Sequence, residues 1–293
     1  MTRPTTAPAA GLAVVLLAAV MAAAGCAGDA PQDDLYLFAG AGLRPALDDM
    51  AAAYRAETGT TVTCDYGGSG MILSRLRLHE RGDLFMPGDM WYVDLAEKDG
   101  LVASKTLVCY FVPVILVPKG NPAGITGLAD LARPGVRLGL GDAEKCQIGR
   151  LCPRIFEKNG LDQAAIDANT RYTSVTVNEL GVQIKTGHLD AAIVWDAIAA
   201  LYPDTAEVIR IPRDQNVISS VAVALLNLSK RPDEARRFID FLTSDRGQAI
   251  FEKHHYRTEP PEQAPRSAVI LRSPKGDEES RRGCCGVVVA AVA

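Results

Sequence analysis

Residues 61–80 read TVTCDYGGSGMILSRLRLHE and contain the pattern that decides the fold. The β-branched and aromatic residues of 61–66 predict a strand, and the glycines and serine of 67–70 predict a tight turn. From 71 to 80, apolar residues recur on one side of a predicted helix. The segment is therefore a strand, a glycine loop and a helix in succession, the repeating unit of a parallel sheet.

The same unit recurs on both sides of this segment. Residues 35–38, 40–42 and 43–58 predict a strand, a turn and a helix, and 84–86 with 91–98 predicts a third unit. A second series follows, with strands at 136–140, 191–194 and helices at 149–159, 177–186. Parallel strands joined by helices imply a doubly wound α/β fold whose ligand crevice lies at the carboxyl ends of the strands.

Two crossings divide the predicted fold into two lobes. The hydrophobic strand 111–118 carries the chain out of a first lobe, 34–111, into a second lobe, 112–215. A returning strand at 217–225 and two helices then place 216–258 back in the first lobe. Residues 259–293 are rich in Pro, Arg, Glu and Ser, and we expect a disordered tail there.

Composition excludes several classes of protein. The 293 residues are 48% apolar and 23% charged, so the chain is neither collagen-like nor a coiled coil, and it can bury a core. Lys and Arg number 31 against 35 Asp and Glu, a formal net charge of −4. No basic surface for nucleic acid is expected, and an anionic ligand would have to be held by local dipoles and hydroxyls.

The amino terminus predicts export. An apolar run at 9–24 follows Arg3 and has the length of a signal peptide rather than of a membrane span. It ends in Gly25-Cys26, which resembles a bacterial lipobox, although Ala23 stands where leucine is usual. Cleavage would make 1–25 the signal, Cys26 the acylated terminus and 26–33 a tether to the cell membrane. A plain signal peptide or a buried apolar helix is the alternative.

Five motifs in order resemble those of the periplasmic molybdate-binding protein family. They are Phe38-Ala39-Gly40-Ala41-Gly42-Leu43, Tyr66-Gly67-Gly68-Ser69-Gly70, Gly82-Asp83-Leu84-Phe85, Gly141-Asp142-Ala143-Glu144 and Ala192-Ile193-Val194-Trp195. The resemblance implies the two-lobed type II periplasmic-binding fold. It also implies a monomeric solute-binding protein that captures molybdate or tungstate and delivers the oxyanion to an ABC permease, with no cofactor and no metal beyond the oxyanion's own.

The resemblance also implies a set of ligand-binding residues. The family holds its dianion with hydroxyl and main-chain N–H groups, and Ser69 matches its second-loop serine; helix N-capping is the alternative role of Ser69. Gly42 stands in place of the family's first-loop serine and Trp195 in place of its tyrosine. Ile148 and Val177, each near a predicted helix start, would contribute main-chain N–H groups.

Other residues support different functions. A sulfate-like, phosphate-like or arsenic oxyanion is the alternative ligand. Cys146 lies on the predicted ligand loop, so its thiol could take part in binding a thiophilic oxyanion; it could instead pair with Cys152. The pairing of Cys64 and Cys109 is left open, and no Cys-x-x-Cys motif indicates zinc. An exported enzyme using Cys146 or Asp196 is a further alternative, but no motif supplies a general base, so we expect a binding protein rather than an enzyme.

Three further positions have ordinary explanations. Asp83 and Asp89 are expected to cap helices or to hold a hinge, and Trp91 to contribute to packing.

Lipid anchoring predicts a difference that a single substitution removes. The native protein should partition into detergent, whereas Cys26→Ser should stay in the aqueous phase, because acyl chains on the cysteine provide the anchor. Mass spectrometry of the mature terminus is the measurement. A terminus that begins elsewhere, or that carries no acyl mass, would leave a freely diffusing binding protein.

Overall fold

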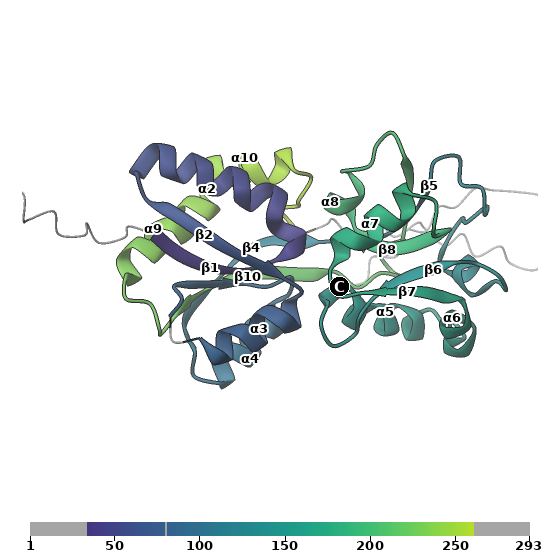
Figure 1. Cartoon of the computed structure of the whole chain (residues 1–293), viewed down its shortest axis with the longest axis horizontal. Helices are drawn as coiled ribbons and strands as arrows, with labels where there is room; N and C mark the ends of the chain where they lie inside the picture. The colour runs from purple at the N-terminus through teal and green to yellow at the C-terminus, as the bar shows by residue number, and fades with distance from the viewer. Residues whose placement is uncertain (1–33, 80, 261–293) are drawn as a thin grey trace, which may run out of the picture. The chain divides into compact units, whose positions relative to one another are not determined.

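A computed structural model describes residues 34–79 and 81–260, which form two five-stranded sheets with helices on their faces (Figure 1). The α/β class and the two lobes expected from the sequence are confirmed. The predicted signal, Cys26, the tether and the tail from 261 onward lie outside the described residues. Among the described residues, no helix is both long enough and apolar enough to cross a membrane.

The first sheet belongs to what we call the first lobe. Its order is β2-β1-β3-β10-β4, with β10 antiparallel to its neighbours β3 and β4. The strands are β1 (Asp34–Gly40), β2 (Thr61–Gly67), β3 (Leu84–Met86), β4 (Val102–Phe111) and β10 (Ser219–Leu226). Because β1, β2 and β3 run parallel, their carboxyl ends meet at one edge of the sheet.

Helices cover both faces of this sheet. They are α2 (Arg44–Thr58), α3 (Ser69–Leu78), α4 (Met90–Lys98), α9 (Pro232–Thr243) and α10 (Asp245–Lys253), with a short turn of helix, η1 (Ala41–Leu43), before α2. Figure 1 shows α2, α9 and α10 on one face and α3 and α4 on the other. Successive residues of β1 point to opposite faces, so Leu37 and Phe38 are buried in different core clusters.

The second sheet, with its helices, forms the second lobe. Its order is β7-β6-β8-β5-β9, and β5 is antiparallel to both of its neighbours. The strands are β5 (Pro113–Pro118), β6 (Leu138–Gly141), β7 (Thr170–Ser174), β8 (Ala191–Trp195) and β9 (Ala206–Arg210). The helices are η2 (Leu128–Ala132), α5 (Gln147–Lys158), α6 (Gln163–Asn169), α7 (Val177–Lys185) and α8 (Asp196–Ala199).

The structure corrects several element boundaries. The strand expected at 111–118 is two strands in different sheets, because β4 ends at Phe111 and β5 begins at Pro113. Most of β4 was missed because its exposed half is polar, and α6, β7 and β9 were missed as well. Both α3 and α5 begin two residues earlier than expected, at Ser69 and Gln147.

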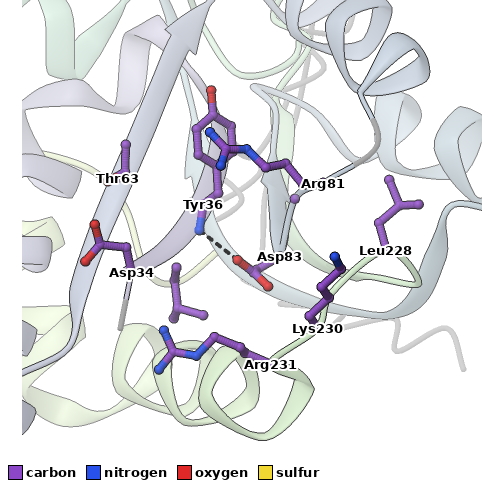
Figure 2. A pocket seen from close by; sticks show the side chains of 10 residues that line it. Asp34, Tyr36, Thr63, Arg81, Asp83, Leu228, Lys230 and Arg231 are labelled. Atoms are coloured by element: carbon purple, nitrogen blue, oxygen red, sulfur yellow. Dashed lines mark hydrogen bonds between the residues drawn. The ribbon is translucent and has the colours of Figure 1, made fainter. Parts of the chain in front are cut away.

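A buried carboxylate joins three strands at the end of the first sheet that lies away from the crevice. Asp83 accepts hydrogen bonds from the backbone N–H of Tyr36 at 2.8 Å and from the hydroxyl of Ser229 at 2.6 Å. Its own backbone pairs with Tyr36 and Leu226. Figure 2 shows this carboxylate directed at the Tyr36 nitrogen. Asp83 therefore has a structural role, but it ties strands together and caps none of the described helices.

Replacing Asp83 by alanine should destabilise the first lobe. The substitution leaves the Tyr36 N–H and the Ser229 hydroxyl without this acceptor, at a cost of about 2–3 kcal/mol in the free energy of unfolding. Urea titration followed by circular dichroism is the measurement. Asp94→Ala is the control, because Asp94 makes only a surface ion pair with Lys105 and its loss should cost less than about 1 kcal/mol. Equal effects of the two substitutions would contradict the assignment.

Candidate functional site

Loops of both lobes enclose a small cavity of about 20 Å³ at the carboxyl ends of the strands. Its size suits a compact solute rather than an extended one. The lining residues share a position next to a strand end or a helix start: Gly40, Ala41, Gly42, Gly67, Gly68, Ser69, Gly88, Phe111, Cys146, Gln147, Thr176, Val177 and Trp195.

Three full helices begin at this cavity. In α3, α5 and α7, the N-cap residues are Gly68, Cys146 and Thr176, and none of these helices has a side-chain hydrogen bond at its cap. The first N–H groups of a helix have no partner within the helix, and they form the positive end of its dipole. The cavity therefore collects neutral hydrogen-bond donors from both lobes.

Ser69 is the first residue of α3 and is 3% exposed. Its Oγ accepts the backbone N–H of Gly88 at 2.9 Å. With that contact made, the hydroxyl hydrogen is left to donate into the cavity. The Gly88 contact also fixes the rotamer of the hydroxyl, so Ser69 is a preorganised donor.

Gly42 and Trp195 lie close together in the cavity lining. A methyl group on Gly42 would lie 3.2 Å from both the Trp195 Cδ1 atom and the Val177 Cγ1 atom, which is tighter than ordinary contact. The indole ring, stacked on Phe111 with centroids 4.8 Å apart, occupies this space. Among the described residues, no hydrogen-bond partner is recorded for the indole N–H, and it is a donor only.

A buried tyrosine fixes the turn that carries Gly42. The Tyr256 hydroxyl donates to the Gly42 carbonyl oxygen at 2.5 Å. Burial raises the pKa of this tyrosine far above its usual value, so the hydroxyl keeps its proton at any physiological pH. The hydrogen bond therefore holds the 40–42 turn in one orientation.

The structure brings most of the sequence-predicted residues together. Gly42, Ser69, Val177 and Trp195 all line the cavity. Ile148 is fully buried and does not line it. Because α5 starts at Gln147, Cys146 and Gln147 take the place expected for Ile148.

Sequence reasoning missed Gln147 and Thr176. Both lie at a helix start, immediately before the first apolar residue of the helix. A search for polar residues at that position would have found them.

The lining is electrically neutral, since none of the described residues around the cavity carries a formal charge. Asp196, which the alternative interpretation as an enzyme would use, lies outside this lining. Its carboxylate pairs with Arg257 at 3.2 Å and accepts the Ala197 N–H at 3.0 Å, and burial raises its pKa. Asp196 therefore joins the two lobes beside the crossing strands.

The two lobes touch at glycines beside the cavity. The Gly70 N–H of α3 donates across the gap to the Lys145 carbonyl oxygen at 3.2 Å. A methyl group at Gly70 would collide with the Glu144 carbonyl oxygen, and one at Gly68 would collide with those of Lys145 and Val175. Only glycine allows this approach of two backbones.

A larger pocket of about 270 Å³ lies at the other end of β1, as Figure 2 shows. Its lining includes Arg81 and Lys230 as well as Asp34, and the Asp83 carboxylate is already hydrogen-bonded. Because this lining carries both basic and acidic side chains, it does not indicate one class of ligand. Within residues 34–79 and 81–260, no cluster of three or more His, Cys, Asp or Glu residues is arranged to hold a metal ion.

Solved structures share this architecture. The periplasmic molybdate-binding protein of Azotobacter vinelandii superposes with a TM-score of 0.66, covering 78% of this chain and 100% of that one, at 17% identity. The likeness shows the type II periplasmic-binding fold.

Sequence comparisons identify the family. A provisionally named binding protein of Haemophilus influenzae is 34% identical over 74% of this chain and 88% of its own. The molybdate-binding protein of Mycobacterium tuberculosis is 26% identical over 75% of this chain and 82% of its own. The family described as bacterial extracellular solute-binding protein matches residues 35–257. The chain therefore belongs to the bacterial extracellular solute-binding proteins.

Proposed function

We propose that the chain captures a tetrahedral oxyanion, molybdate or tungstate, between its lobes. One observation carries the proposal: the cavity between the lobes is lined by the starts of three helices and by the Ser69 hydroxyl, all of them without a formal charge. An anion taken from water loses its hydration and must receive donors in return. Main-chain N–H groups supply these donors without a second buried charge that would itself need compensation.

The protonation state of the ligand follows from the same donors. The Ser69 hydroxyl hydrogen and the Trp195 indole N–H both donate, and the Ser69 oxygen already accepts from Gly88. An oxyanion that carries a proton would need an acceptor for it, whereas a fully deprotonated dianion needs donors only. Molybdate and tungstate meet this condition at neutral pH.

The relatives support the choice of metal oxyanion. The mycobacterial protein, similar over three quarters of this chain, is named for molybdate. Gly42 and Trp195 change the shape of the cavity, so a sulfate-like dianion is the competing ligand, and it satisfies the same donor requirement.

Delivery to a membrane permease completes the proposed function. Extracellular solute-binding proteins hold their cargo outside the membrane, and the predicted signal and Cys26 would keep this chain close to an ABC permease. In this proposal the protein acts as a lipid-anchored monomer, exported and facing outward, without catalysis.

Oxyanions should stabilise the mature protein selectively. Molybdate or tungstate at millimolar concentration should raise the melting temperature, because a ligand bound only by the native state shifts the folding equilibrium, and chloride should not. Ser69→Ala should weaken molybdate binding by about 1–3 kcal/mol, measured by calorimetry. Ser74→Ala is the matched control on α3, since that exposed hydroxyl bonds only the Gly70 carbonyl oxygen.

Two results would change the assignment. If sulfate raises the melting temperature and molybdate and tungstate do not, the family assignment stands and sulfate becomes the proposed ligand. No shift with any oxyanion would reject the oxyanion proposal.

The Cys146 thiol suggests an arsenic oxyanion as the alternative ligand. Its thiol is buried in the cavity lining, and burial raises its pKa to about 11, with the Ile148 and Gly149 N–H groups acting in the opposite direction. The group is therefore a neutral thiol at physiological pH, whereas a thiophilic ligand is captured by thiolate. The four described cysteines, Cys64, Cys109, Cys146 and Cys152, are free thiols.

Cys146→Ser should leave anion selectivity unchanged. Because the thiol stays protonated, molybdate affinity should be flat between pH 6 and pH 9, and the serine variant should match the wild type apart from a loss of stability. Binding isotherms for molybdate and arsenite, with Cys64→Ser as control, test this. Arsenite binding that rises with pH toward about 11 and disappears in Cys146→Ser would reverse the assignment.

A further inference from the structure

We propose that the first turn of α5 is a clasp that holds the lobes closed over the ligand, with Arg150 as its positioning residue. The clasp consists of Gln147 and Arg150 in the second lobe and Asp89, Trp91 and Ser219 in the first. The proposal deepens the proposed function, and its ligand-dependent tests rest on that function.

The outer contact lies at the rim of the crevice. The Arg150 guanidinium stacks on the Trp91 ring, with its Cζ atom 3.9 Å from the ring centroid. The Asp89 carboxylate lies 3.9 Å from the same guanidinium. A planar cation between an indole face and a carboxylate gains both a cation–π contact and an ion pair. Both partners come from the opposite lobe, so opening must break both.

The receiving surface is held rigidly. Asp89 is the N-cap of α4, and its side chain accepts the Trp91 backbone N–H at 2.8 Å. The sequence predicted this capping role for Asp89, which is confirmed. Trp91 was expected only to pack, yet its side chain is 40% exposed. An exposed indole fixed by a cap at its own backbone provides a ready platform for a cation from the other lobe.

The inner contact reaches the cavity. Gln147 is buried, lines the cavity, and donates from Nε2 to the Ser219 hydroxyl of the first lobe at 3.0 Å. Its Oε1 accepts from the Arg150 Nε at 3.1 Å. One side chain of the second lobe thus connects the ligand cavity to the rim. Arg150 holds Gln147 in the orientation that pairs with Ser219, and it needs no contact with the ligand.

This arrangement predicts an effect on release rather than on capture. The open form lacks the clasp, so the association rate should change little, whereas dissociation requires that the clasp break. A merely structural residue would instead lower stability without separating the two rates.

The test is stopped-flow kinetics on the mature protein with molybdate as the probe. Arg150→Ala should speed dissociation by about 2- to 30-fold, the range of one cation–π contact, with the association rate nearly unchanged. Trp91→Leu should speed dissociation similarly. Trp91→Phe should speed it less, because an aromatic ring remains for the cation to stack on. The double variant Arg150→Ala/Trp91→Leu should dissociate no faster than the faster of the two single variants, because both substitutions remove the same contact.

Arg154→Ala is the matched control, one turn further along α5, where the arginine is exposed and, among the described residues, makes no hydrogen bond or ion pair with the first lobe. It should leave both rates unchanged. The proposal would be overturned if the two single effects on the dissociation rate added up in the double variant. It would also be overturned if Arg150→Ala and Arg154→Ala changed the dissociation rate equally.

A ligand-free measurement separates this proposal from the choice of ligand. Small-angle X-ray scattering should show a larger radius of gyration for Arg150→Ala and Trp91→Leu than for the wild type and Arg154→Ala. If molybdate does not bind but this difference is present, the clasp stands and the proposed function fails. If the radius of gyration is the same in all four proteins, the clasp is rejected whatever ligand binds.

Discussion

In the proposed function, the cost of removing an anion from water determines how the site is built. A charged ligand in a closed cavity needs hydrogen bonds for its oxygens, and a buried countercharge would bring its own desolvation cost. The chain meets the requirement with backbone, by ending parallel strands of both lobes at one crevice and starting α3, α5 and α7 there. The glycine loops, the two sheets and the crossing strands all serve to bring these helix starts together.

Much of this could be predicted from sequence, because the determining signals are local. The strand, glycine loop and helix of 61–80 located Ser69, and repetition of the unit gave the α/β class. Errors arose where tertiary contacts override local signals. The polar half of β4 is a strand because β10 pairs with it, and the chain changes sheets at Val112, inside a continuous apolar run. The place of Gln147 at a helix start has a local signal, but its pairing with Ser219, 72 positions away, has none.

Gly42 and Trp195 are sterically matched, because the indole lies where a side chain on residue 42 would otherwise fit. The resemblance to the molybdate-binding proteins implies a serine and a tyrosine at these two positions. Here the same wall carries an aromatic N–H, stacked on Phe111. The indole N–H only donates, whereas a hydroxyl can also accept.

The glycine contact between the lobes acts as a mechanical stop. With Gly68 and Gly70 against the carbonyl groups of Glu144, Lys145 and Val175, the two backbones cannot approach further, and the cavity cannot shrink around a smaller anion. An anion with longer bonds would hold α3 away from the 144–145 turn and prevent the Gly70 hydrogen bond. In the proposed function, the contact between these two stretches of main chain would therefore limit the size of the bound anion, even where no side chain touches it.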